Sequence, residues 1–294
     1  MPVFFALAAA CFFAGVGIAA KRGVQHNSLV TAMVVSLPVG ALVMLVFALF
    51  DLPESVSLGG VGLFVAAGFI GEGVGRTSFI LAVQRIGPST ATPIQTATYP
   101  VFALVGGVLL FSETVTPLRI VGAMAIVAGI WALVGQGRSA SAGAADRTAG
   151  SGRWVYLVPV VSGLAFAGSD IVRKLGLVEI PFAAFGALVG NVTIVVVWGL
   201  VLAFVPRVRS LAKPGPGWQW FLLAGVLAGL GVLSVFRALG SGDVSVVGPI
   251  IMAQPLAVVM LSALFLRDLE RLTWKIVLGA VLTVLGVILI TISG

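Results

Sequence analysis

Residues 136–153 read QGRSASAGAADRTAGSGR and form the longest polar stretch in this chain of 294 residues. Small and polar residues bury too little apolar area to order themselves, so we expect a flexible linker here. The sequence on both sides is strongly apolar, and the linker divides it into residues 1–135 and residues 154–294. The chain is therefore predicted to consist of two halves of similar length.

The composition is that of a membrane protein. Hydrophobic residues make up 60% of the chain and charged residues 9%, whereas soluble domains carry about 25% charged residues. So few charges cannot cover the surface of a soluble fold of this length, and this excludes a soluble enzyme or a nucleic-acid-binding protein. The net charge of +7 is instead expected to mark cytoplasmic loops, which are rich in Lys and Arg.

Apolar stretches separated by polar or Gly/Pro-rich turns predict an all-α membrane protein with five helices in each half. A helix needs about 20 apolar residues to cross the hydrocarbon core of a bilayer. The ten predicted spans are 2–20, 28–50, 58–84, 89–111, 116–135, 154–176, 180–205, 216–239, 243–266 and 272–292.

The two halves repeat each other. Phe13-Ala14-Gly15 recurs 153 residues later as Phe166-Ala167-Gly168. A second ordered set recurs 157 residues later: Glu113, Thr116, Gly122, Ala123 and Gly129 match Glu270, Thr273, Gly279, Ala280 and Gly286. Because five spans is an odd number, the second half must enter the membrane from the opposite side. The sequence thus predicts a 5+5 inverted repeat, which is typical of secondary transporters.

The positive charges predict an orientation. Four Lys and Arg residues lie in loops after the even-numbered spans, and Arg76 lies within a span. The loops after the odd-numbered spans hold the other twelve: Lys21, Arg22, Arg85, Arg138, Arg147, Arg153, Arg207, Arg209, Lys213, Arg267, Arg271 and Lys275. Since cytoplasmic loops carry the excess of positive charge, we expect the odd loops in the cytoplasm and both termini outside.

Glu72 and Arg76 fall near the middle of the third span and share one helix face. Charged groups in hydrocarbon are costly and tend to face a bundle interior or a water-filled cavity. One interpretation is a substrate or proton site, in which Glu72 titrates and Arg76 holds an anionic group. The other is a self-neutralising structural pair, with the neighbouring glycines Gly71, Gly73 and Gly75 allowing close packing.

The fourth and ninth spans carry paired prolines, which remove backbone donors and free carbonyl groups one turn earlier. Broken helices at corresponding positions of two repeats point to a binding site. Polar side chains beside them are candidates for binding a polar solute, or for satisfying the freed carbonyls. The prolines are Pro93, Pro100, Pro249 and Pro255, and the polar residues are Gln95, Thr98, Tyr99 and Gln254.

Further charges lie towards the ends of two spans. Asp170, Arg173 and Lys174 have the spacing that lets the carboxylate neutralise either cation. They are candidates for a cavity mouth, or for an interfacial cluster whose long cations reach the headgroups. Arg237, at the end of the eighth span, has the same two interpretations.

Other features are expected to be structural. Glu113 and Glu270 lie in equivalent turns, where each is expected to accept hydrogen bonds near the start of the next helix. The Gly186–Gly190 and Gly225–Gly229 spacings are expected to allow close helix packing. The spans 116–135 and 272–292 hold few polar residues, so we expect them at the lipid-facing periphery, where a homodimer contact is an open alternative.

The sequence resembles a known family at the ends of both repeats. The stretch FLRDLERLT, residues 265–273, followed by Gly279-Ala280 and Gly286, is similar to the end of an EamA-type repeat. The stretch LFSE, residues 110–113, followed by Gly122-Ala123 and Gly129, is similar too. The chain resembles the ten-helix EamA branch of the drug/metabolite transporter superfamily. This resemblance implies a 5+5 inverted fold, a central cavity and export of small metabolites or amino acids, with both termini in the cytoplasm, unlike the charge count.

Together these features predict a secondary transporter that exports small polar or amphipathic solutes, with proton coupling motivated by Glu72 and Asp170. A translocator of a lipid-linked sugar or other amphiphile is the alternative within the same class. From another class, the string Gly240-Ser241-Gly242-Asp243 matches the GxGD pattern of intramembrane proteases, but Asp243 is better explained as a helix N-cap. No cofactor or metal is expected. Arg outnumbers Lys 13 to 4, which favours the inner membrane of a prokaryote.

Overall fold

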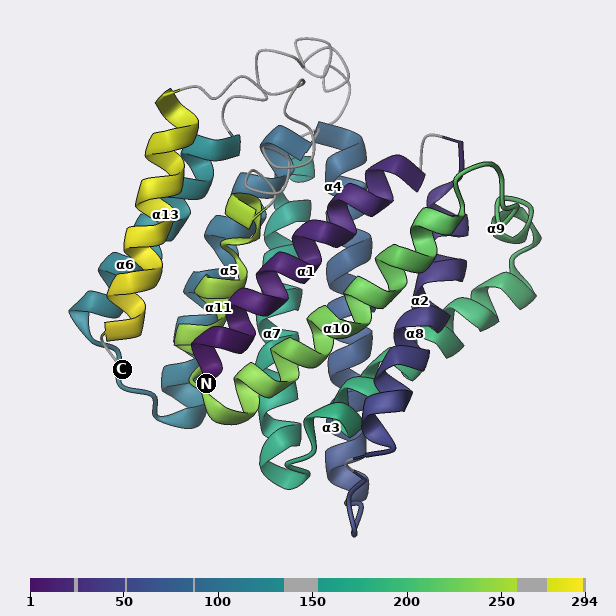
Figure 1. The fold of residues 1–294 in the computed structure, drawn as a ribbon, viewed down its shortest axis with the longest axis horizontal. Coiled ribbons are helices and arrows are strands. Elements are labelled where there is room, and N and C mark those ends of the chain that lie inside the picture. The colour runs from purple at the N-terminus through teal and green to yellow at the C-terminus, as the bar shows by residue number, and fades with distance from the viewer. Residues whose placement is uncertain (24–25, 51, 87, 135–152, 258–273, 293–294) are drawn as a thin grey trace. The chain divides into compact units, whose positions relative to one another are not determined.

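The computed structural model describes residues 1–23, 26–50, 52–86, 88–134, 153–257 and 274–292, and in these ranges every regular element is a helix (Figure 1). The predicted linker, apart from Arg153, and Glu270 lie outside the described residues. The principal helices are α1 (Pro2–Gly23), α2 (Leu29–Ala48), α3 (Leu58–Gly68), α4 (Arg76–Ile86), α5 (Pro88–Phe111), α6 (Pro117–Val134), α7 (Leu157–Glu179), α8 (Ala183–Phe204), α10 (Gln219–Ser241), α11 (Val244–Ile251) and α13 (Trp274–Ile292). Shorter elements are a π-helix, η1 (Phe69–Gly75), a 3-10 turn, η4 (Arg153–Tyr156), and α9 (Pro206–Arg209).

Seven helical segments of the described chain are long and apolar enough to cross a membrane. They are Pro2–Ala20, Leu29–Ala48, Leu58–Ala82, Ile94–Phe111, Trp154–Glu179, Ala183–Phe204 and Gln219–Ser241. Shorter apolar helices cover Pro117–Ala132, Val244–Ala257 and Val281–Ile292. Eight of these ten segments lie within the predicted ranges, and Trp154–Glu179 and Gln219–Ser241 extend two or three residues beyond theirs. The 5+5 arrangement of ten spans stays a prediction.

The described helices form two compact units, each of which takes helices from both predicted halves. The first unit contains residues 1–69 and 172–241, and the second contains residues 70–171 and 242–294. Each unit thus combines segments that are far apart in the sequence.

Glycines allow the close helix contacts of the first unit. A Cβ atom at Gly225 would lie 2.6 Å from the Ser36 carbonyl oxygen, so α10 and α2 meet backbone to backbone. A Cβ atom at Gly68 would lie 2.3 Å from the Gly190 carbonyl oxygen, which joins α3 to α8 in the same way. These contacts confirm the predicted packing role of the Gly186–Gly190 and Gly225–Gly229 spacings, because small residues let membrane helices approach closely.

In the second unit, α6 and α13 pack side by side (Figure 1). Gly122 faces the Gly286 carbonyl oxygen, at 2.8 Å from its would-be Cβ atom. Gly129 faces the Gly279 carbonyl oxygen at 2.7 Å. The glycine faces of α6 and α13 are therefore packed against each other within one chain. The predicted homodimer contact would have to use the other faces of these helices, and it stays a prediction.

The third predicted span is not one uniform α-helix. It changes at Phe69 from α3 into the π-helix η1 and returns to α-helix at Arg76. Glycine has a low helix propensity, and three of the seven residues of η1 are glycines: Gly71, Gly73 and Gly75. π-Helices are rare, occur mostly as single turns inside α-helices, and are frequent at functional sites. The break places Glu72 inside the π-turn.

The prolines of the two predicted broken helices act differently. Helix α11 ends at Ile251, with a turn at residues 252–253 and helix again at residues 254–257. Pro255 lacks the amide that would have bonded the Ile251 carbonyl, which explains a break at this point. Helix α5, in contrast, runs unbroken through Pro93 and Pro100.

Candidate functional site

A buried hydrogen bond joins α5 to α7 at the centre of the candidate site. The Tyr99 hydroxyl donates to the Asp170 carboxylate, and the two residues are 1% and 5% exposed. Hydrogen bonds to an ionised acceptor are stronger than those between neutral groups. Both residues lie in segments long and apolar enough to span a membrane, where a carboxylate is costly and marks a candidate substrate or ion pathway.

The ring of Tyr99 is held from the other side by α11. A Cβ atom at Gly248 would lie 2.6 Å from the Tyr99 Cε1 atom and 3.0 Å from its hydroxyl oxygen. A Cβ atom at residue 248 would therefore have to displace the Tyr99 ring. The phenol is therefore confined between α11 and the Asp170 carboxylate.

Helix α7 also contacts the π-helix and the polar face of α5. The buried Ser162 hydroxyl donates to the Gly75 carbonyl oxygen at 2.8 Å. The next residue, Gly163, lies against the Gln95 carbonyl oxygen and the Thr98 side chain, each 2.9 Å from its would-be Cβ atom. The site is thus built where α7 meets both η1 and α5.

Glu72 and Arg76 form the expected pair. The Arg76 Nε atom lies 2.8 Å from Glu72 Oε2, and the Arg76 side chain is 27% exposed. The carboxylate and the guanidinium neutralise each other's charge, as the interpretation of a structural pair requires. Both side chains are also partly exposed, as the interpretation of a substrate or proton site requires.

The remaining predicted polar residues of this unit lie on α5 and in the short helical segment that follows α11. Gln95 is buried on α5, and Thr98 donates its hydroxyl to the Ile94 carbonyl at 2.7 Å. Thr98 thus satisfies a backbone group of its own helix. Gln254 is half-buried, directly before Pro255.

Two predicted cations belong to the other unit, where each contacts an aromatic ring. The Arg173 guanidinium lies 5.3 Å from the centre of the Phe236 ring, and that of Arg237 lies 5.8 Å from the centre of the Phe5 ring. Both distances allow a cation–π interaction. Arg173 is buried, whereas Arg237 is exposed.

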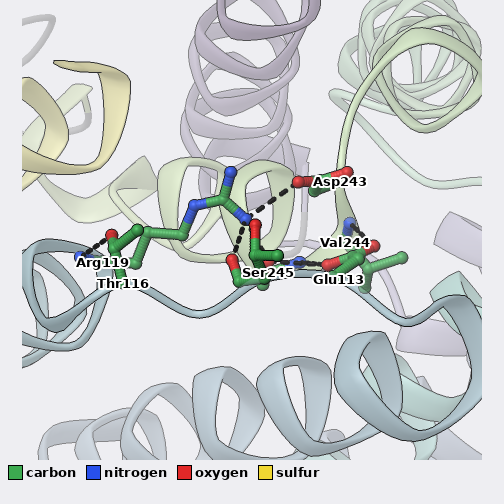
Figure 2. A network of polar contacts seen from close by, with 7 residues as sticks. Glu113, Thr116, Arg119, Asp243, Val244 and Ser245 are labelled. Carbon is green, nitrogen blue, oxygen red and sulfur yellow. Dashed lines mark hydrogen bonds and ion pairs between the residues drawn. The ribbon is translucent and has the colours of Figure 1, made fainter. Parts of the chain in front are cut away.

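A second polar network, which the sequence predicted only in part, connects the α5–α6 turn to the start of α11 (Figure 2). Glu113 was expected to cap the next helix, α6, but its carboxylate accepts hydrogen bonds from the Val244 and Ser245 amides at 2.8 and 3.0 Å. Asp243 stands at the N-cap position of α11, as predicted, but its side chain makes no capping bond. It pairs instead with Arg119, at 2.8 Å.

The cap comes from a residue distant in sequence because Asp243 is engaged elsewhere. Arg119 also donates to the Thr114 carbonyl at 2.9 Å and to the Ser245 hydroxyl at 3.3 Å. Glu113 and Ser245 are separated by 132 residues, so no local spacing signals the contact. The aspartate of the GxGD string is thus part of an ion pair at a helix start.

A chain whose helices are long and apolar enough to span a bilayer, with buried charges inside those helices, is a multi-pass membrane protein. The EamA-like transporter family matches residues 1–135 and 153–292, and the chain belongs to this family. Its members are transporters, not enzymes.

The fold is shared with a solved structure. A crystal structure, described only as that of a protein, superposes with a TM-score of 0.78 at 15% sequence identity, covering 99% of this chain and 97% of the other. No curated protein matches the sequence. The likeness at this identity concerns the fold alone.

Proposed function

We propose that the protein is a secondary active transporter that exports small metabolites or amino acids by alternating access. The observation that carries this proposal is the hydrogen bond between Tyr99 and Asp170, buried within apolar helices of one unit. Isolated polar groups are rarely retained at membrane depth unless they serve a pathway. The inner membrane of a prokaryote is the proposed location.

The charges of this unit suit a zwitterionic solute. Asp170 offers an acceptor for an ammonium group, with Tyr99 beside it. Arg76, partly exposed, offers a donor for a carboxylate, and guanidinium groups bind carboxylates well. An amino acid carries both groups, which supports this substrate class.

The proposal is tested with purified protein in liposomes that contain a panel of radiolabelled amino acids and metabolites. We expect efflux of at least one amino acid above that of empty liposomes, and faster efflux when a pH gradient is imposed. Glu72, paired with Arg76, is the proposed proton-coupling carboxylate, so Glu72→Gln should remove the gradient dependence and leave the protein folded. Gradient dependence equal to wild type in this variant would refute the coupling role.

An apolar groove favours a second candidate, the transport of an amphiphile. The groove lies between α5 and α6, has a volume of about 640 Å³, and is lined by apolar side chains that include Ala97, Leu104, Met124 and Trp131. An acyl chain would meet almost only apolar surface along these described walls. An apolar groove between helices can hold the acyl chain of a lipid-linked substrate, whereas a soluble solute does not need one.

Filling the groove separates the two candidates. Ala128 lies on its wall and is exposed, so Ala128→Trp should fill the groove without disturbing the core. If the substrate is an amphiphile, this variant should transport a fluorescent lysolipid several-fold more slowly than wild type. Efflux of amino acids should not change. Equal lysolipid rates in the variant and wild type would count against the second candidate.

A further inference from the structure

We propose that Glu113 and Arg119 are positioning residues, which hold α11 in the setting that places Gly248 against Tyr99 and thereby fix the Tyr99–Asp170 hydrogen bond. The inference rests on the proposed function only in taking Tyr99 and Asp170 as the candidate site. It assigns a role to a network that lies outside that site, just beyond the C-terminal end of α5; Figure 2 shows this network.

The Glu113 carboxylate fixes the first turn of α11 in two directions. Its Oε1 atom accepts the Val244 amide at 2.8 Å, and its Oε2 atom accepts the Ser245 amide at 3.0 Å and the Ser245 hydroxyl at 2.6 Å. The amides of two successive residues lie about 100° apart around a helix axis, so bonds from both to one carboxylate define the rotation of the helix as well as its height. The negative charge also suits the positive end of the helix dipole.

Arg119 closes the network from the first turn of α6. It connects Asp243, the Thr114 carbonyl and the Ser245 hydroxyl through one guanidinium nitrogen. Glu113 and Arg119 are 8% and 5% exposed, and such charged hydrogen bonds are strengthened by the low dielectric of their surroundings. The residues just before and within the start of α11 are therefore bound to the α5–α6 segment.

The setting of α11 decides what meets Tyr99. Gly248 follows Val244 by four residues, about 6 Å along a helix. A rotation of about 100°, one residue, would bring Val247 or Pro249 towards the ring, where even a Cβ atom would be 2.6 Å from Cε1. Pro249 also removes one hydrogen bond inside this eight-residue helix. A short helix weakened in this way depends on its external cap to keep its rotation.

The environment of Tyr99 can be observed directly, because the chain contains two tyrosines, Tyr99 and Tyr156. Protein labelled with 3-fluorotyrosine in detergent micelles should give two fluorine resonances, and Tyr156→Phe assigns them. We expect Glu113→Ala to shift the Tyr99 resonance and leave that of Tyr156 in place. Glu54→Ala, which removes an exposed carboxylate, is the matched control and should move neither resonance.

Gly248→Ala tests whether Glu113 acts on Tyr99 through the contact of α11 with the ring. It should shift the Tyr99 resonance by itself, and its effect should not add to that of Glu113→Ala, because both act on the same contact. If Glu113→Ala does not fold, Glu113→Gln keeps the side-chain length but loses the charge and one acceptor oxygen, and it should shift the same resonance. A folded Glu113 variant with an unmoved Tyr99 resonance, or additive shifts in the double variant, would overturn the proposal.

This outcome is independent of transport. If an amino acid is transported, Glu113→Gln should raise its KM several-fold more than it lowers the maximal rate, because the site is displaced and not removed. Loss of stability alone would reduce the amount of active protein and therefore the maximal rate, but not change KM. A shifted Tyr99 resonance without transport of any tested solute would refute the proposed function and leave the positioning role intact.

Discussion

Gly129→Ala will lower the stability of the protein although alanine is the better helix former. The added Cβ atom would lie 2.4 Å from Thr283 Oγ1 and 2.7 Å from both the Gly279 carbonyl oxygen and the Thr283 amide nitrogen. Two of these atoms belong to the backbone of α13, so the helices must separate. Overpacking of this kind costs about 1–3 kcal/mol, which exceeds the roughly 1 kcal/mol that alanine gains over glycine in a helix.

Gly199→Ala is the matched control, because a Cβ atom at Gly199, within α8, would meet nothing within 4 Å. Thermal unfolding in detergent should show a lower midpoint for Gly129→Ala and an equal or higher midpoint for Gly199→Ala. If Gly129→Ala proves as stable as Gly199→Ala, α6 and α13 do not pack backbone to backbone at Gly129.

The same glycines show how far the sequence predicts the fold. Gly122 and Gly129 of the first repeat correspond to Gly279 and Gly286 of the second. In the structure Gly122 faces Gly286, which is the counterpart of Gly129, and Gly129 faces Gly279, which is the counterpart of Gly122. This crosswise contact makes α6 and α13 antiparallel, the relation that an inverted repeat requires of its fifth helices. The repeat signal thus predicts a contact as well as an element.

Other neighbours have the directions expected of ten alternating spans. Along α3 and α8, residue 64 meets 186 and residue 68 meets 190, so these helices are parallel. Along α1 and α10, residue 13 meets 231 and residue 23 meets 221, so these are antiparallel. Both relations follow from the predicted order of spans. Helices α3 and α8 are the third and seventh predicted spans, which run in the same direction. Helices α1 and α10 are the first and eighth, which run in opposite directions.

Two features of the site were beyond sequence reasoning for a physical reason. Hydropathy predicts one continuous span over 58–84. It does not detect a π-turn, because the hydropathy of a segment is the same whether its residues form an α-turn or a π-turn. The capping of α11 by Glu113 arises from a tertiary contact, and Asp243 looks like a sufficient cap in the sequence. In contrast, Glu72 and Arg76 were predictable as a pair because their spacing is local.

Asp170→Asn is expected to reduce transport roughly tenfold or more. The asparagine has the same size and still accepts a hydrogen bond from Tyr99, so the fold should remain. The charge is lost, however, and a hydrogen bond to a charged group contributes about 1.5–3 kcal/mol, where about 1.4 kcal/mol is a tenfold change in an equilibrium constant. A substrate ammonium that binds this carboxylate should therefore bind at least tenfold more weakly.

Tyr99→Phe tests the same site from its other side, because it keeps the ring against Gly248 and removes only the hydroxyl. We expect a smaller loss than for Asp170→Asn, since the carboxylate keeps its charge but loses one donor. Glu54→Gln, in an exposed segment, is the matched control for the loss of one negative charge and should transport at the wild-type rate. Efflux from liposomes, normalised to folded protein, measures all three. A folded Asp170→Asn variant with wild-type efflux would show that the buried carboxylate is structural, because a group in the substrate pathway cannot lose its charge without changing the binding of a charged solute.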